Sequence, residues 1–464
     1  MSNVYILIIV LAAVTLLLLM VLKLKISAFI SLLITSIFVA IASGMPLNSI
    51  MDSIQEGMGG TLGFVAIVVG LGAIFGQILE SSGGAESLAH YLVKKFGRDR
   101  ASWAMVITGF IVAIPVFLDV GLVILVPILY ALSRDTRRSL LYYGIPLLAG
   151  LAVTHSFIPP TPGPIAVAEI LDAELGWIIL FGFLLGFPTA VIAGPLFGSY
   201  ISRKIDIQPP EEMIVAKPDT RVKKGAEDRA APEERKEPPS FRSIALLIAV
   251  PLVLILVNTF TSVAVGREVF EKTLVTDALI FIGHPFSALI IAALLATYFL
   301  GIRRGKSKKE ILELSTKALA PAGIIILITG AGGVLKQVLV DSGIGEAMAR
   351  SISGSAMPPI FLAWLLAAII RVTQGSATVA MITAAGIIAP VLDFIEPSAP
   401  ELALIVLAIA SGATLLSHVN DSGFWLVSKY FGMDEKQTLR SWTVMESIIA
   451  FCGLGFTMLA SIFV

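Results

Sequence analysis

Apolar segments of helix length recur from one end of this chain to the other. A helix needs about 20 consecutive apolar residues to cross a bilayer, and most of the segments approach that length. They lie near residues 4–22, 27–44, 61–80, 101–132, 139–157, 176–201, 241–262, 277–300, 318–340, 357–395, 401–416 and 441–464. The recurrence predicts an all-α polytopic membrane protein.

The charges are too few and too unevenly placed for a soluble protein. Only 14% of the 464 residues are charged, whereas a soluble domain has about 25%. Ten of the 33 Lys and Arg residues and nine of the 33 Asp and Glu residues fall within residues 202–242. The rest of the chain therefore cannot cover its apolar residues with a polar surface, which excludes a soluble globular enzyme and a disordered protein.

One polar linker divides the chain into two halves, each with six apolar segments. We expect an N-terminal transmembrane repeat (1–201), a charged cytoplasmic linker (202–240) and a C-terminal transmembrane repeat (241–464). The stretch from 202 to 242 also holds six prolines and few apolar residues. It therefore cannot bury a core of its own.

The basic residues predict a broken helix in each half. Four clusters of Lys and Arg lie at residues 94–100, 134–138, 202–242 and 303–309. If all are cytoplasmic, segment 101–132 must begin and end inside with only 32 residues, fewer than the roughly 40 that two crossings need. A re-entrant hairpin broken near Pro115–Gly121 resolves this conflict, and the same reasoning applies to 357–395.

An internal repeat supports the division into halves. Residues 70–89 and 330–349 match at eight of twenty positions, and Gln, Ser and Glu are among the matches. With the odd number of crossings in each half, this predicts two inverted repeats of about six transmembrane segments, as in secondary transporters. The alternative is a bundle of stacked helices without common ancestry.

The proline-rich stretch 149–168 is the first candidate site. Its prolines cannot continue a helix, and lipid tolerates such backbone only where it lines a cavity or lies within protein. Hydroxyl groups and one imidazole beside it are suited to bind a substrate. The residues that we select are Thr154, His155, Pro160, Thr161 and Gly163. The alternative is an ordinary extracytoplasmic loop.

Isolated polar groups mark the two predicted breaks. Asp119 is a single carboxylate in an apolar segment, which is suited to carry a proton; the alternative, compatible with this role, is that it caps the returning helix. In the second half, Arg371 could neutralise a carboxylate, or extend to the membrane interface. The neighbouring groups suited to bind hydroxyls are Gln374, Gly375, Ser376 and Thr378.

A fourth polar stretch follows the fifth segment of the second half, in the place that His155 holds in the first. His418, Asn420 and Asp421 lie there between apolar segments. Histidine titrates near neutral pH, so we expect His418 and Asp421, with Asp119 and His155, to couple protons, and Asn420 to contact the substrate. The alternative is a water-exposed loop.

Several classes of site have no support. The chain has one cysteine and four histidines, none in a HExxH spacing, and no GxxxxGK[ST] segment. We therefore expect no metal, no cofactor and no direct use of ATP. Because the net charge is zero, no nucleic-acid partner is expected.

At these same stretches the chain resembles the gluconate permease (GntP) family of bacterial secondary transporters. The resemblance rests on IPVFLDVGLVILVPI (114–128), THSFIPPTPGP (154–164), TQGSATVAMITAAGI (373–387), LSHVNDSGFWLVSKYFGM (416–433) and TLRSWTVMESI (438–448). It implies import of gluconate or a related small hydroxy acid with protons, across the inner membrane, through a cavity between inverted repeats. The matched positions are Asp119, His155, Pro159, Pro160, Gly163, Gln374, Gly375, Ser376, Thr378, His418, Asn420 and Asp421.

One position departs from the family pattern. The proline-rich loop of the family often has a second histidine where this chain has Thr161. This leaves D-serine or another small hydroxy acid open as the substrate. A sodium-coupled carrier or channel, an intramembrane enzyme and a homo-oligomer also remain open, while a small anionic substrate, protons and the lipid bilayer are the partners that we expect.

Overall fold

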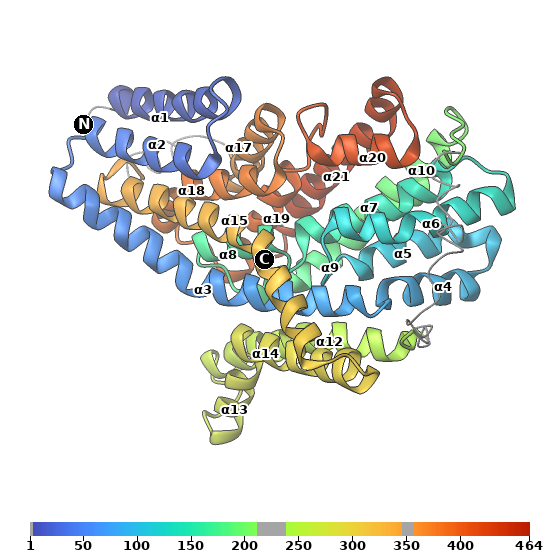
Figure 1. Ribbon diagram of the computed structural model, residues 1–464. Helices are drawn as coiled ribbons and strands as arrows, with labels where there is room; N and C mark the ends of the chain where they lie inside the picture. The colour runs from blue at the N-terminus through green and yellow to red at the C-terminus, as the bar shows by residue number, and fades with distance from the viewer. Residues whose placement is uncertain (1–2, 211–237, 346–356) are drawn as a thin grey trace, which may run out of the picture.

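The computed structural model describes residues 3–210, 238–345 and 357–464, and within these ranges it is helical, without a strand (Figure 1). The first half contains α1 (Asn3–Leu18), α2 (Ala28–Ala42), α3 (Leu47–Ser81), α4 (Gly84–Phe96), α5 (Ala101–Val112), α6 (Leu118–Thr136), α7 (Leu141–Phe157), α8 (Pro162–Ile170), α9 (Leu175–Val191) and α10 (Phe197–Ile201). The second half contains α12 (Phe241–Gly266), α13 (Leu274–Gly283), α14 (Pro285–Ala296), α15 (Lys308–Asp341), α17 (Pro359–Gln374), α18 (Ala377–Ile395), α19 (Ala399–Gly412), α20 (Ser422–Phe431) and α21 (Glu435–Ala460).

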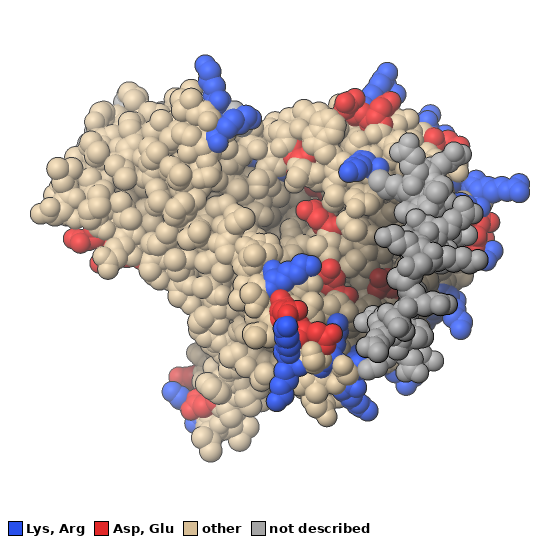
Figure 2. Space-filling model, in the orientation of Figure 1, with Lys and Arg blue, Asp and Glu red and all other residues tan. Residues whose placement is uncertain are grey.

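The helices have the length and apolarity that the bilayer requires. Among the described residues, eight helices are long and apolar enough to cross a membrane, and five shorter helices are also apolar. Figure 2 shows a face that is mostly uncharged, with most of its Lys and Arg toward the right and lower parts and a few at the top. The prediction of an all-α polytopic membrane protein is confirmed.

Both predicted helix breaks are present. The first break separates α5 from α6 at residues 113–117, and the second separates α17 from α18 at residues 375–376. With 12 residues, α5 is about 18 Å long, which is less than the roughly 30 Å of a hydrocarbon core. In each half, two helices that end at a break therefore replace one continuous helix.

The two longest helices, α3 and α15, come from different halves and pack along each other (Figure 1). Ser53 Oγ donates to Asp341 Oδ2 at 2.6 Å, and Gly57 and Gly333 allow the two backbones to approach closely. In both halves a long helix precedes the broken pair. Part of the second repeated segment, from residue 346, lies outside the described residues, and the opposite orientation of the halves stays a prediction.

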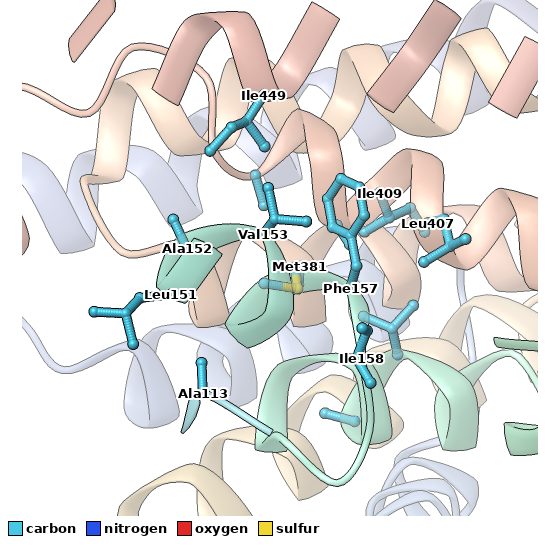
Figure 3. Packing of buried hydrophobic residues seen from close by; sticks show 14 of the residues in the cluster. Ala113, Leu151, Ala152, Val153, Phe157, Ile158, Met381, Leu407, Ile409 and Ile449 are labelled. Atoms are coloured by element: carbon cyan, nitrogen blue, oxygen red, sulfur yellow. The ribbon is translucent and has the colours of Figure 1, made fainter. Parts of the chain in front are cut away.

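The broken helices pack on a tightly closed core. Gly109 of α5 faces the α7 backbone, and Gly150 of α7 faces the α5 backbone, so that a Cβ at either position would overlap main-chain atoms. Around this contact Phe157, Ile158 and Met381 join the helices of both halves (Figure 3). The core thus fixes the end of α7, where His155 lies.

Two of the basic clusters and the start of the predicted linker lie close to one another. Arg98 pairs with Asp135 at 3.2 Å, which joins two of the clusters. Ser139 beside them donates to the Ile205 carbonyl at 3.1 Å, at the start of the predicted linker. Residues 211–237 of that linker lie outside the described residues, so its limits and its cytoplasmic location stay predictions.

Candidate functional site

A cavity of about 370 Å³ lies where the helix breaks of the two halves meet. Its wall is formed by the starts of α6, α18 and α20, the ends of α7 and α17, and the middle of α21. Pockets for small molecules occupy about 300–1,000 Å³. The lining residues are Leu118, Asp119, Ala152, His155, Ser156, Arg371, Gln374, Gly375, Ser376, Ala377, Thr378, Thr414, Asn420, Asp421, Ser422, Gly423, Trp442 and Glu446.

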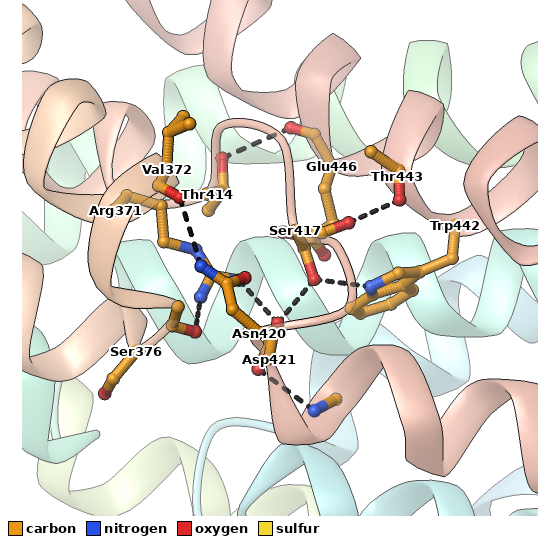
Figure 4. A network of polar contacts seen from close by, with 12 residues as sticks. Arg371, Val372, Ser376, Thr414, Ser417, Asn420, Asp421, Trp442, Thr443 and Glu446 are labelled. Carbon is orange, nitrogen blue, oxygen red and sulfur yellow. Dashed lines mark hydrogen bonds and ion pairs between the residues drawn. The ribbon is translucent and has the colours of Figure 1, made fainter. Parts of the chain in front are cut away.

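A buried ion pair dominates the second-half wall. Arg371 Nη2 lies 2.5 Å from Asp421 Oδ2, and the two side chains are only 3% and 13% exposed. Arg371 also donates to the Gly375 carbonyl, and Ser417 donates to the same Asp421 oxygen (Figure 4). The burial of Arg371 contradicts the alternative in which this side chain extends to the membrane interface.

The ion pair belongs to a network that fixes the second break. Asn420 Nδ2 donates to the carbonyls of Val372 (3.1 Å) and Thr373 (3.4 Å) near the end of α17. Gly375 has φ +87°, and a Cβ there would overlap the Asn420 backbone. Because only glycine adopts this φ readily, the sequence at this point permits both the break and the contact with the Asn420 loop.

Aromatic and hydroxyl groups of α21 hold the same loop from the other side. Trp442 Nε1 donates to Ser417 Oγ at 2.6 Å, and Thr443 donates to the Ser417 carbonyl (Figure 4). Asp421 Oδ1 accepts from the Gly423 N–H at 3.0 Å and caps α20. The second-half wall is therefore pre-organised by hydrogen bonds.

The first-half wall is more sparsely bonded. Asp119 lies in the first turn of α6 with its side chain exposed to the cavity, but the cap of that helix is Phe117. The alternative in which Asp119 caps α6 is therefore wrong. Across from it His155 packs edge-on against Phe117, with ring centroids 6.1 Å apart, and its Nδ1 is buried without a partner in the described part of the chain.

Nine of the sequence-predicted residues line this cavity together. They are Asp119, His155, Arg371, Gln374, Gly375, Ser376, Thr378, Asn420 and Asp421. Their proximity follows from the two breaks, because each break exposes side chains and helix ends at the same place. Their roles in binding and proton coupling stay predictions.

The remaining predicted residues lie elsewhere. Thr154 is fully buried and donates to the Phe110 carbonyl at 2.9 Å, and Thr161 donates to Ile158 O at 2.6 Å. Gly163 packs against Met381. Pro160 and Thr161 line a separate gap of about 20 Å³, and His418 is absent from the cavity wall.

The proline-rich stretch as a whole is buried in protein, which contradicts an ordinary extracytoplasmic loop. The chain leaves α7 after Phe157 and enters α8 at Pro162, the first helical position, where proline is favoured. Buried backbone of this kind meets the requirement for non-helical chain at membrane depth. Most of the stretch nevertheless faces the core and not the cavity.

Sequence reasoning missed several lining residues, and Glu446 is the most consequential. It is the only charged residue of α21 beyond Arg440, and it lies in the TLRSWTVMESI segment. A lone acid in an apolar helix was therefore a visible signal, of the same kind as Asp119. Thr414, just after α19, and Trp442 of α21 gave no comparable signal, because the sequence does not reveal that their side chains point to the cavity.

The charges of the cavity wall are unbalanced. Among the lining residues, Arg371 is the one cation with a permanent charge, and Asp119, Asp421 and Glu446 are carboxylic acids. Three helices, α6, α18 and α20, begin at the wall and direct their positive N-terminal ends toward it. In the described ranges no group of three or more His, Cys, Asp or Glu is placed to hold a metal ion.

Comparison with known proteins assigns the family. The model of the GntP family permeases matches residues 5–463. A gluconate permease of Pseudomonas aeruginosa is 42% identical over 95% of this chain and 94% of its own, and one of Bacillus subtilis is 40% identical over 99% and 100%.

The fold also resembles a solved transporter. The crystal structure of the YdaH transporter of Alcanivorax borkumensis superposes with a TM-score of 0.59 and covers 90% of both chains, at 13% sequence identity. The family match along nearly the whole chain and the relatives named permeases indicate a transporter and not an enzyme. The chain belongs to the GntP family of permeases and is a multi-pass membrane transporter.

Proposed function

We propose that this permease imports gluconate, or a closely related small hydroxycarboxylate, together with protons. The relatives in Pseudomonas aeruginosa and Bacillus subtilis are named gluconate permeases, and they match nearly the whole chain. Since the family is bacterial, the site of transport is the inner membrane. The cavity at the two breaks is the substrate site.

The charge of the cavity wall is the observation that carries the coupling to protons. Arg371 is already paired with Asp421 at 2.5 Å, so its charge is neutralised before any substrate arrives. Asp119 and Glu446 add further carboxylic acids. An anion that enters such a wall is repelled unless protons neutralise part of it. Proton binding and anion binding therefore favour each other.

The substrate contacts follow from the same geometry. The carboxylate of the substrate competes with Asp421 for Arg371 and is attracted by the starts of α6, α18 and α20. Gln374, Thr378 and Asn420 present amide and hydroxyl groups to the hydroxyls of the sugar acid. His155 and Asp119 face these groups from the first half.

Alternating access is proposed on the arrangement of the two halves. The site lies between broken helices of different halves, and the polar network holds only the second-half wall. Movement of one inverted repeat against the other would expose the cavity to each side of the membrane in turn.

Uptake of labelled gluconate into proteoliposomes with an inward proton gradient tests this proposal. We expect accumulation without sodium, blocked best by unlabelled gluconate and less by glycerate or D-serine. Gluconate uptake that needs sodium, or that only equilibrates, would contradict proton symport. Proton-driven uptake of D-serine in place of gluconate would contradict the substrate and retain the coupling.

A matched pair of variants tests the location of the site. Thr378→Val removes a hydroxyl from the cavity wall, and Thr316→Val removes one from the exposed face of α15. Loss of one hydrogen bond of about 1 kcal/mol raises KM for gluconate about fivefold, whereas Thr316→Val leaves it unchanged. Equal KM values in the two variants would place the substrate elsewhere.

A further inference from the structure

Glu446 is a buried acid in the cavity wall with an incomplete set of partners. Its side chain is 4% exposed, and its Oε1 has no hydrogen-bond partner among the described residues. Its backbone carbonyl accepts from Thr414 Oγ1 at 3.3 Å, which anchors this turn of α21 to the end of α19. The backbone at Glu446 is thus held in place, while one oxygen of its carboxyl group, Oε1, stays unsatisfied (Figure 4).

The three acids of the cavity wall differ in their surroundings. Asp421 accepts from Arg371, from Ser417 and from the Gly423 N–H, so its negative charge is well satisfied. Asp119 is exposed to the cavity, where water can solvate it. Glu446 is more deeply buried than either, and its Oε1 has no hydrogen-bond partner among the described residues. A buried carboxylate with an unsatisfied oxygen is costly to keep charged, so Glu446 is the acid best suited to hold a proton.

The charged and titratable groups around Glu446 are few. Arg371 of α17 and Asp421 at the start of α20 act on it most directly, with opposite signs. His155 of α7 and Asp119 of α6 face it across the same cavity, and His418 lies in the connection between α19 and α20. The described parts of α9 and α19 that pack on α21 contribute no charged group near it.

We propose that Glu446 is the residue through which proton binding is coupled to substrate binding in this permease. This inference rests on the proposed symport. A proton from the outer solution binds the Glu446 carboxylate and removes one negative charge from the cavity wall. The substrate carboxylate then displaces Asp421 from Arg371. After the cavity opens to the inside, the substrate leaves, Asp421 pairs with Arg371 again, and Glu446 releases its proton to the inner solution.

Glu446→Gln in proteoliposomes tests the coupling, with Glu435→Gln as the matched control at the exposed start of the same helix. Two activities are measured with labelled gluconate. One is accumulation under an inward proton gradient. The other is exchange against unlabelled gluconate at equal pH on both sides, which needs no net movement of protons. Both are recorded across a series of pH values.

We expect Glu446→Gln to lose at least about tenfold in gradient-driven accumulation, and its remaining exchange to become independent of pH. Glu435→Gln should match the unmodified protein in both activities. Accumulation by Glu446→Gln at the normal level would overturn the assignment. If the unmodified protein itself showed no gradient-driven uptake of gluconate, that result would contradict the proposed function. It would not by itself contradict the role of Glu446.

Glu446→Asp decides the case in which the glutamine variant does not exchange at all. Aspartate keeps a proton-binding group on a shorter side chain. Gradient-driven accumulation with a shifted pH profile in this variant would support the coupling role. No accumulation, or a pH profile identical to that of the unmodified protein, would assign Glu446 a structural role only.

Discussion

The two helix breaks meet at one cavity but are built differently. The break between α17 and α18 is held by an ion pair, a left-handed glycine and hydrogen bonds from Asn420, which together place Arg371 and the Asn420 loop. The break between α5 and α6 contains Pro115 and is followed by Asp119, whose carboxyl group is exposed to the cavity. Without substrate the second-half wall is therefore rigid, whereas the first-half wall offers groups that are free to respond to a ligand.

The largest expected effect comes from breaking the ion pair of the rigid wall. Arg371→Gln leaves Asp421 charged and buried, and removal of one partner of a buried pair costs about 3–5 kcal/mol. We expect a large fall in the thermal unfolding midpoint in detergent and loss of transport. The double variant with Asp421→Asn should recover part of the stability. Lys309→Gln breaks an exposed ion pair and should change the midpoint little.

The second-largest effect is expected at Gly375, the glycine of the same break. Gly375→Ala places a side chain at positive φ and against the Asn420 backbone, at a cost of about 2–4 kcal/mol. Gly343→Ala also falls at positive φ but meets no atom of the described residues within 4 Å, so it should cost only about 1 kcal/mol. Equal shifts of the unfolding midpoint for the two variants would show that the Asn420 loop gives way easily.

The smallest effect on stability is expected in the first-half wall. Asp119→Asn removes a charge that no described side chain pairs with, so the unfolding midpoint should change by less than the equivalent of about 0.5 kcal/mol. The rate of gluconate uptake should still change, because the charge of the cavity wall changes. A large loss of stability would mean that the two walls are equally rigid.

The sequence was sufficient to predict the breaks, because proline and glycine within apolar segments have a direct backbone consequence. It was not sufficient for the direction of side chains near a break. Thr154 and Thr161 belong to the correct stretch, yet both donate to nearby carbonyls in the core. The orientation of short non-helical segments depends on packing between the halves, and no local pattern encodes that packing.

In α21, by contrast, a residue that lines the cavity was missing from the prediction. By its sequence this helix resembles an ordinary crossing, although an acid within its apolar part, Glu446, is as unusual as Asp119. Its importance depends on α19 and α20, which bring the Asp421 loop against the middle of α21. Tertiary contacts among these consecutive helices, which no local pattern encodes, decided its significance.

The unbalanced charge of the cavity wall also has an electrical consequence. A membrane potential of 100 mV, negative inside, opposes the entry of each uncompensated anion by about 2.3 kcal/mol. One proton that travels with one monovalent anion makes the cargo neutral, and the fixed charges of Arg371 and Asp421 remain with the protein. Uptake at that ratio would be insensitive to voltage and would depend on the pH difference alone, whereas a second proton would turn the same voltage into a driving force.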